Sequence, residues 1–144
     1  DFVFTDVAVN SKNQVFSGNY AVVADENGYF LIDQKGKACF EKRFPNAKGM
    51  EGGYYAVADE SGQWGFADEK GELVVPCQYV DAYSFSNQTA AVQYAGKWGY
   101  INRYGNMVID AQFSTALPFL NGKAMVQDDQ ENIKVLELRY FDTF

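Results

Sequence analysis

A repeating unit of 34 residues is the feature that most constrains how this chain folds. When the sequence is shifted by 34 positions, the segment around Trp64-Gly65 falls on the segment around Trp98-Gly99. The other matched positions are Ala56 with Ala90, Gly62 with Gly96, Phe66 with Tyr100, Gly71 with Gly105, Val74 with Val108, Tyr79 with Phe113, Ala82 with Ala116 and Phe85 with Phe119. A unit this short cannot bury its own apolar face, so neighbouring copies have to stack and share a core.

A weaker copy precedes these two at an offset of 35 residues, and in it Tyr29-Phe30 stands where Trp64-Gly65 stands. The following copy departs from the pattern at Asn132, and we expect residues 133–141 to form a capping strand. The predicted organisation is a single domain over residues 1–144, made of a lead-in (1–18), a divergent repeat (19–53), two regular repeats (54–87 and 88–121) and a partial repeat with a cap (122–144).

Each unit predicts three short strands. In the copy at residues 54–87 they are expected at residues 54–60, 63–69 and 72–79, joined by turns that contain Gly62 and Gly71. Glycine suits such turns because it accepts a positive φ without steric cost. Pro76 indicates that the third strand is peripheral or ends there. The tail of the unit, residues 80–88, is predicted to fold back over the sheet.

We therefore predict an all-β fold in which tandem antiparallel hairpin repeats stack as an open array. A small closed ring, like a propeller or a barrel, is the alternative, with the lead-in and the tail paired. Residues that recur in every copy are expected to be structural, because each unit needs them in the same place. These structural markers are Trp64, Gly65, Trp98, Gly99, Gly71 and Gly105.

The motifs resemble those of the WG (or KWG) β-repeat family. The resemblance rests on residues 97–102 (KWGYIN) with Gly105, and on residues 63–68 (QWGFAD) with Gly71. It implies a bacterial WG repeat-containing protein, with repeats in arrays of varying number, and that variation favours the open array. It supplies no catalytic residues. It leaves the compartment open, with the cell envelope or a secreted location favoured over the cytoplasm.

The amino-acid composition argues against most kinds of catalytic site and metal site. The chain has no histidine, which excludes Ser-His-Asp and Cys-His catalysis and histidine-ligated zinc. Its two cysteines, Cys39 and Cys77, are interpreted as buried free thiols. The neighbouring carboxylates Asp59-Glu60 and Asp68-Glu69 are expected to be solvated turn residues rather than a glycosidase pair, because adjacent residues on a strand point to opposite faces. We expect no enzymatic activity, no cofactor and no metal.

The net charge of −7 argues against a nucleic-acid partner, and no apolar run is long enough for membrane insertion. Positions that differ between copies are the better binding candidates, namely Tyr94, Tyr104 and Tyr83. Tyr94 and Tyr104 fall at hairpin ends and are predicted to form an exposed aromatic pair.

The leading hypothesis is a non-enzymatic, monomeric repeat module that presents a β-surface for protein–protein interaction or scaffolding. A lectin-like binder of cell-envelope glycans is the alternative, and a carboxylate-based glycosidase is a distant third.

Overall fold

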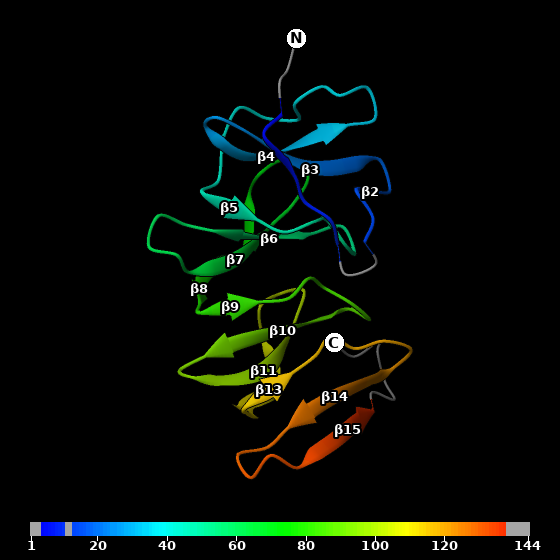
Figure 1. The fold of residues 1–144 in the computed structure, drawn as a ribbon, viewed down its shortest axis with the longest axis vertical. Helices are drawn as coiled ribbons and strands as arrows, with labels where there is room; N and C mark the ends of the chain where they lie inside the picture. Colours follow the sequence, from blue (N-terminus) through cyan, green and yellow to red (C-terminus); the bar gives the residue numbers. More distant parts are fainter. Residues whose placement is uncertain (1–3, 11–12, 138–144) are drawn as a thin grey trace.

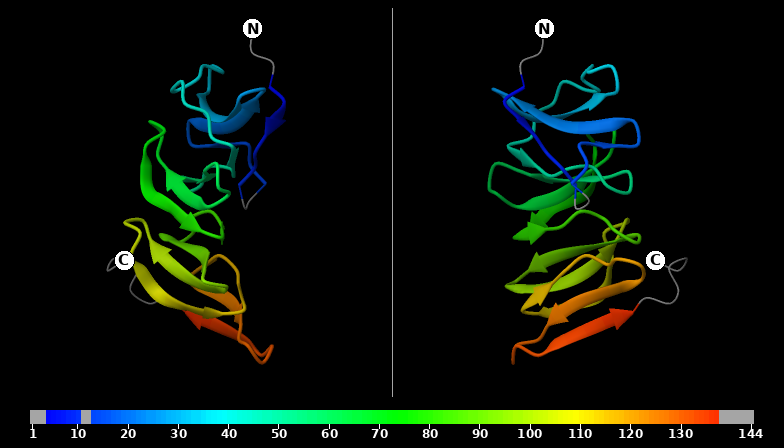
Figure 2. Two further views of the ribbon diagram at one scale, coloured as in Figure 1. Left: turned by 90° about the vertical axis from the view of Figure 1, so that its left-hand side faces the viewer. Right: turned by 45° about the vertical axis from the view of Figure 1, so that its right-hand side comes forward.

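The computed structural model describes residues 4–10 and 13–137, and all the regular structure in them is β. Four antiparallel sheets follow one another along the long axis of the molecule (Figure 1). Two further views place the first and last sheets at opposite ends (Figure 2). The predicted all-β open array is confirmed, and the described residues do not close into a ring.

The sheets are built in chain order. The first contains β1 (Asp6–Val7), β2 (Phe16–Ser17), β3 (Tyr20–Asp25) and β4 (Gly28–Asp33). The second contains β5 (Asn46–Ala47), β6 (Tyr55–Ala58), β7 (Trp64–Ala67) and β8 (Leu73–Tyr79). The third contains β9 (Asp81–Ala82), β10 (Thr89–Tyr94), β11 (Lys97–Asn102) and β12 (Met107–Phe113). The fourth contains β13 (Thr115–Ala116), β14 (Lys123–Gln127) and β15 (Ile133–Glu137).

Each sequence unit is shared between two sheets. The tail of the unit at residues 54–87 contains β9, and β9 pairs with β10 of the next sheet, Asp81 lying opposite Gln93. The tail covers its own sheet as predicted, since the Phe85 ring lies 4.6 Å from the Phe66 ring and Ala82 packs in the same layer. The sequence did not indicate that the backbone of the tail also satisfies the free edge of β10, so that the tail belongs to the next sheet by hydrogen bonding.

The core consists of layers between the sheets, because each inner sheet is apolar on both faces. Val22 and Leu31 of the first sheet pack against Tyr55 and Val57 of the second. The layer between the second and third sheets contains Ala56, Phe66, Val75, Tyr79, Ala82, Phe85, Ala90, Val92 and Ile101. The layer between the third and fourth contains Ala91, Trp98, Tyr100, Phe113, Ala116, Phe119, Ala124 and Val126.

Strand pairing corrects one part of the repeat register. Ala56 lies opposite Phe66, whereas the residue opposite Tyr100 is Ala91 and not Ala90. The reason is a difference in hairpin length: five residues separate the pair Ala58 and Trp64, but four separate Gln93 and Trp98. A constant offset of 34 therefore assigns Ala90 to the wrong face of its sheet.

The glycine of each Trp-Gly step lies against the backbone of the last strand of its sheet, which is β8 for Gly65 and β12 for Gly99. A Cβ atom at Gly99 would stand 2.6 Å from the carbonyl oxygen of Ile109, and one at Gly65 would stand 2.4 Å from that of Val75. The register between β11 and β12 shifts at this point, which brings the backbone of β12 over Gly99. Glycine is needed at this step because any side chain would collide with backbone that cannot move aside.

We expect Gly99→Ala to lower the free energy of unfolding by roughly 1–3 kcal/mol, because the added methyl group displaces β12. Urea denaturation followed by tryptophan fluorescence measures the change. The matched control is Lys134→Ala at the same repeat position on β15, where the described residues contain no fourth strand. Equal effects of the two substitutions would contradict this explanation of the motif.

Candidate functional site

The structure does not bring the predicted tyrosine pair together. Tyr94 ends β10 and Tyr104 follows β11, so the two side chains lie at opposite ends of β11. The Tyr94 ring packs edge-on against Tyr79, with 6.3 Å between ring centroids. Tyr83 is half-buried and stacks on Trp98 at 5.3 Å. None of the three forms a shared aromatic surface with another.

The turns after the Trp-Gly strands are held by a recurring side-chain acceptor. The Asp68 carboxylate accepts hydrogen bonds from the backbone N–H groups of Lys70 and Glu72, at 2.9 and 3.0 Å. Asn102 accepts two equivalent bonds in the next sheet, at 3.0 Å each. Gly71 and Gly105 complete these turns with φ angles of +78° and +85°. This geometry gives both glycines a structural role.

Three further aspartates hold turns in the same way, and their pKa values are lowered. The hydrogen bond from the N–H of Lys37 lowers the pKa of Asp33, and desolvation raises it. The hydrogen bonds have the larger effect, so the pKa of Asp33 is lowered. The Ser61 hydroxyl lowers the pKa of Asp59, and the N–H of Asn132 lowers that of Asp128. A general acid needs a raised pKa, so these carboxylates are suited to holding turns and not to donating protons.

We expect these three aspartates to make stability depend on acidity. Their folded pKa values lie below the unfolded value of about 3.9, so their contribution is complete above that pH and is lost as the pH falls through the folded values. Thermal midpoints should fall less between pH 5 and pH 2 in the triple variant Asp33→Asn, Asp59→Asn, Asp128→Asn than in the unchanged chain. Asparagine keeps the acceptor, as Asn102 shows. Parallel declines in the two proteins would contradict this assignment.

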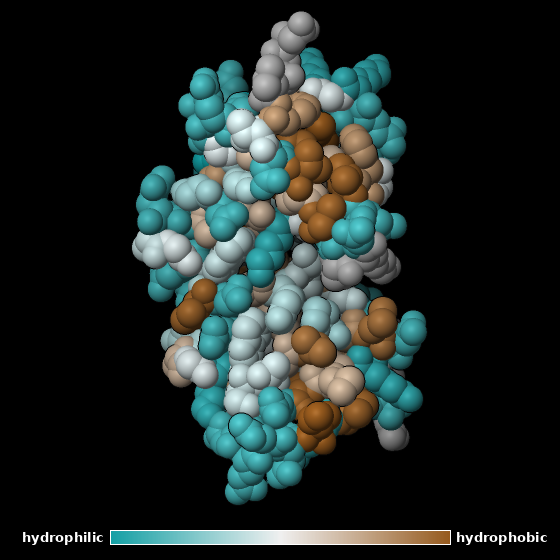
Figure 3. All heavy atoms as spheres, in the orientation of Figure 1, coloured by the Kyte–Doolittle hydropathy of each residue, from teal (hydrophilic) through white to brown (hydrophobic). Residues whose placement is uncertain are grey.

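The outer face of the fourth sheet carries uncovered apolar side chains, which we call the terminal face: Leu117, Met125, Ile133 and Val135. Met125 lies opposite Val135 as Ala91 lies opposite Tyr100 in the third sheet. Ala91 and Tyr100 are both 0% exposed, whereas Met125 is 49% and Val135 is 62% exposed. Apolar atoms gather over β14 and β15 in the surface view (Figure 3).

The outer face of the first sheet is partly covered. Val7 and Phe16, which lie opposite Val23 and Ala21 on this face, are 43% and 41% exposed. Ala21, Val23 and Phe30 point away from the second sheet, yet all are buried. Phe4 and Phe40, which come from outside the strands, pack over them. The centre of the outer face of the first sheet is thus covered by the chain's own residues, while the terminal face at the other end is open within the described part of the chain.

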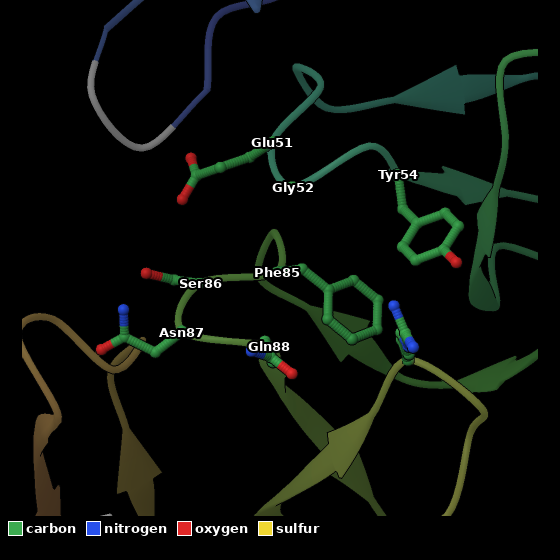
Figure 4. A pocket seen from close by; sticks show the side chains of 8 residues that line it. Glu51, Gly52, Tyr54, Phe85, Ser86, Asn87 and Gln88 are labelled. Atoms are coloured by element: carbon green, nitrogen blue, oxygen red, sulfur yellow. The ribbon is translucent and has the colours of Figure 1, made fainter. Parts of the chain in front are cut away.

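A pocket of about 280 Å³ lies between the second and third sheets and is named here the turn pocket. Its lining consists of Glu51, Gly52, Tyr54, Phe85, Ser86, Asn87, Gln88 and Arg103. Figure 4 shows the Glu51-Gly52 loop facing the turn that carries Asn87 and Gln88, with the Tyr54 ring beside Phe85. Tyr104 is not among the lining residues, but Arg103 donates a hydrogen bond of 2.9 Å to its hydroxyl group.

The thiols and carboxylates do not gather into a reactive centre within the described residues. Cys39 and Cys77 are both free, but Cys39 is exposed, which makes the prediction of two buried thiols wrong for that residue. Desolvation raises the pKa of both thiols, which keeps them protonated near neutral pH. Across residues 4–10 and 13–137 no group of three or more potential metal ligands comes together. The same residues contain no helix able to cross a membrane.

Sequence reasoning missed both the terminal face and the turn pocket. The terminal face has a signal in the sequence, since Met125, Ile133 and Val135 are apolar although no sheet covers them within the described residues. For the turn pocket the signal is Gln88, which stands where the neighbouring copies have glycine. Neither signal could be interpreted without the strand register.

The family model described as "WG containing repeat" matches residues 64–98 and 98–131. The first range runs from Trp64 to Trp98, and the second begins at Trp98 and ends just before β15. No curated protein sequence matches the chain.

Solved structures share the fold at low sequence identity. The computationally designed Ika4 protein is 12% identical, with a TM-score of 0.57 over 95% of this chain and 92% of that one. Hsv2 of Kluyveromyces lactis is 14% identical, with a TM-score of 0.55 over 94% of this chain and 46% of that one. BamB from Moraxella catarrhalis is 13% identical, with a TM-score of 0.52 over 87% and 43%. The chain thus spans slightly less than half of Hsv2 and BamB, and these likenesses concern the fold alone.

Proposed function

We propose that this chain, which belongs to the WG-containing repeat family through residues 64–131, is a non-enzymatic module that binds another protein through its terminal face. The observation that carries the proposal is the contrast between equivalent positions. Positions whose side chains are covered in the third sheet have exposed side chains in the fourth sheet, and these exposed side chains are apolar. An apolar patch with a polar rim is typical of a protein-interaction surface.

The way the sheets stack indicates what kind of surface fits. In the layer between the third and fourth sheets, a face bearing large side chains meets the small alanine and valine side chains of the following sheet. Tyr100, for example, lies in one cluster with Ala124 and Val126. A partner that presents a flat surface of small apolar residues, such as the face of another β-sheet, would repeat this packing on Met125 and Val135.

The rim of the terminal face adds polar contacts. Lys123 and Glu137 lie opposite each other at one side, and Thr115 and Gln127 lie opposite each other at the other. Alternation along β14 and β15 places these side chains on the same face as Met125. They would orient a partner, while the apolar centre would supply most of the affinity.

Non-enzymatic action is supported by the chemistry of the ionisable groups. The shifted aspartates have lowered pKa values and hold turns, and both thiols have raised ones. A nucleophile or a general acid requires the opposite shifts.

We expect Val135→Lys to weaken capture of the partner by roughly ten-fold or more, because docking would bury an unpaired ammonium group. The full chain is immobilised and exposed to extract from cells that produce it, and retained proteins are quantified by mass spectrometry. Val80→Lys is the matched control, since Val80 is 58% exposed but precedes β9, far from the terminal face in sequence and sheet. One protein should be retained by the unchanged chain and by the control, and lost with Val135→Lys. Identical retention by all three would refute the proposal.

A further inference from the structure

The turn pocket contains a strained residue at a position where the repeat uses glycine. Equivalent two-residue turns occur in the second, third and fourth sheets, and both residues of each have positive φ angles. The second residue is Gly53 in one turn and Gly122 in another, but Gln88 in the turn between them, with a φ of 64°. A left-handed glutamine is disfavoured by sterics, and such strain is typical of functional positions.

Hydrogen bonding by Gln88 within the protein does not compensate for this strain. Its side chain is exposed and makes no hydrogen bond with any residue that the structure describes. The neighbouring side chains differ in this respect. The side-chain Oδ1 of Asn87 accepts a hydrogen bond from the N–H of Gly122 at 2.7 Å, and the Ser86 hydroxyl donates to the backbone carbonyl oxygen of Phe119 at 2.5 Å. The turn is therefore anchored to the fourth sheet, while the Gln88 amide is left available at the pocket.

Arg103 brings a second available group to the same pocket. Its guanidinium donates to the Tyr104 hydroxyl and stands 5.0 Å from the centroid of that ring. Within residues 4–10 and 13–137 it has no ion-pair partner. Tyr104 thus orients the guanidinium, whose remaining N–H groups are free to donate.

An aromatic wall completes the pocket. The Tyr54 ring is half-buried and lies 5.5 Å from the buried Phe85 ring, in a tilted arrangement that fixes its orientation. The lining carries one carboxylate, Glu51, and one guanidinium, so it has no net charge. This balance disfavours phosphate esters and other strongly charged ligands.

We propose that the turn pocket binds an uncharged pyranose ring of a glycan. The ring hydroxyls would meet the Gln88 amide, which both donates and accepts hydrogen bonds, and the Arg103 guanidinium, which only donates them. The apolar C–H face of the sugar would pack on Tyr54. A volume of about 280 Å³ suits one small ring, since ligand pockets typically begin at roughly 300 Å³. This site is separate from the terminal face and does not depend on it.

The test is a titration of the full ¹⁵N-labelled chain with D-glucose, N-acetyl-D-glucosamine and inorganic phosphate, followed by amide chemical shifts. We expect saturable shifts with at least one sugar, centred on residues 51–54 and 86–88, and none there with phosphate. Gln88→Gly and Arg103→Gln should each weaken binding by roughly five-fold, the effect of one lost hydrogen bond.

Two controls separate binding from folding. Gln88→Gly should raise the thermal midpoint, because glycine relieves the left-handed strain, so its weaker binding cannot come from unfolding. Tyr94→Ala, at the far end of β11, should leave sugar affinity unchanged. The proposal is overturned by the absence of saturable shifts with both sugars, by binding of phosphate alone, or by sugar binding that Gln88→Gly and Arg103→Gln leave intact.

Discussion

Face-to-face stacking of the sheets is the interaction on which the rest of this structure depends. Each inner sheet is apolar on both sides, so none could remain stable in water without a neighbour above and below. The layers bury Val22 and Leu31, then Ala56 and Phe66, and then Ala91 and Tyr100 in equivalent places. Stacking also determines which face lacks a neighbour, because within the described residues no further sheet lies over the outer face of the fourth sheet.

The Trp-Gly step connects this stacking to strand pairing. Its glycine allows β8 and β12 to pass directly over β7 and β11. Where the marker is lost, the regular fourth strand is absent as well. Phe30 takes the glycine position in the first sheet, and residues 38–44 reach β4 only through isolated bridges. In the fourth sheet the position is Lys134, and no described strand pairs with the outer edge of β15.

Function is proposed at the two places where the repeat is interrupted. The terminal face keeps apolar side chains at positions that a following sheet would cover. The turn pocket replaces a conformationally permissive glycine by Gln88, which has a polar side chain and a strained backbone. Regular positions serve the scaffold, as the aspartates that hold the turns illustrate. In a repeat protein, residues that recur in every copy serve the scaffold. A residue that differs from its equivalents in the other copies is therefore the better candidate for contact with a ligand or a partner.

The sequence by itself predicted the all-β class and the repeat length, because spacing and turn chemistry are local properties. It favoured an open array through the family resemblance and left a closed ring as the alternative. It indicated correctly that Pro76 lies on a peripheral strand. Only the tertiary structure decided that Asp81-Ala82 joins the following sheet, that Ala91 is the counterpart of Ala56, and that Tyr94 and Tyr104 lie apart. These outcomes depend on strand register, and a one-residue change in hairpin length reverses which face a side chain occupies.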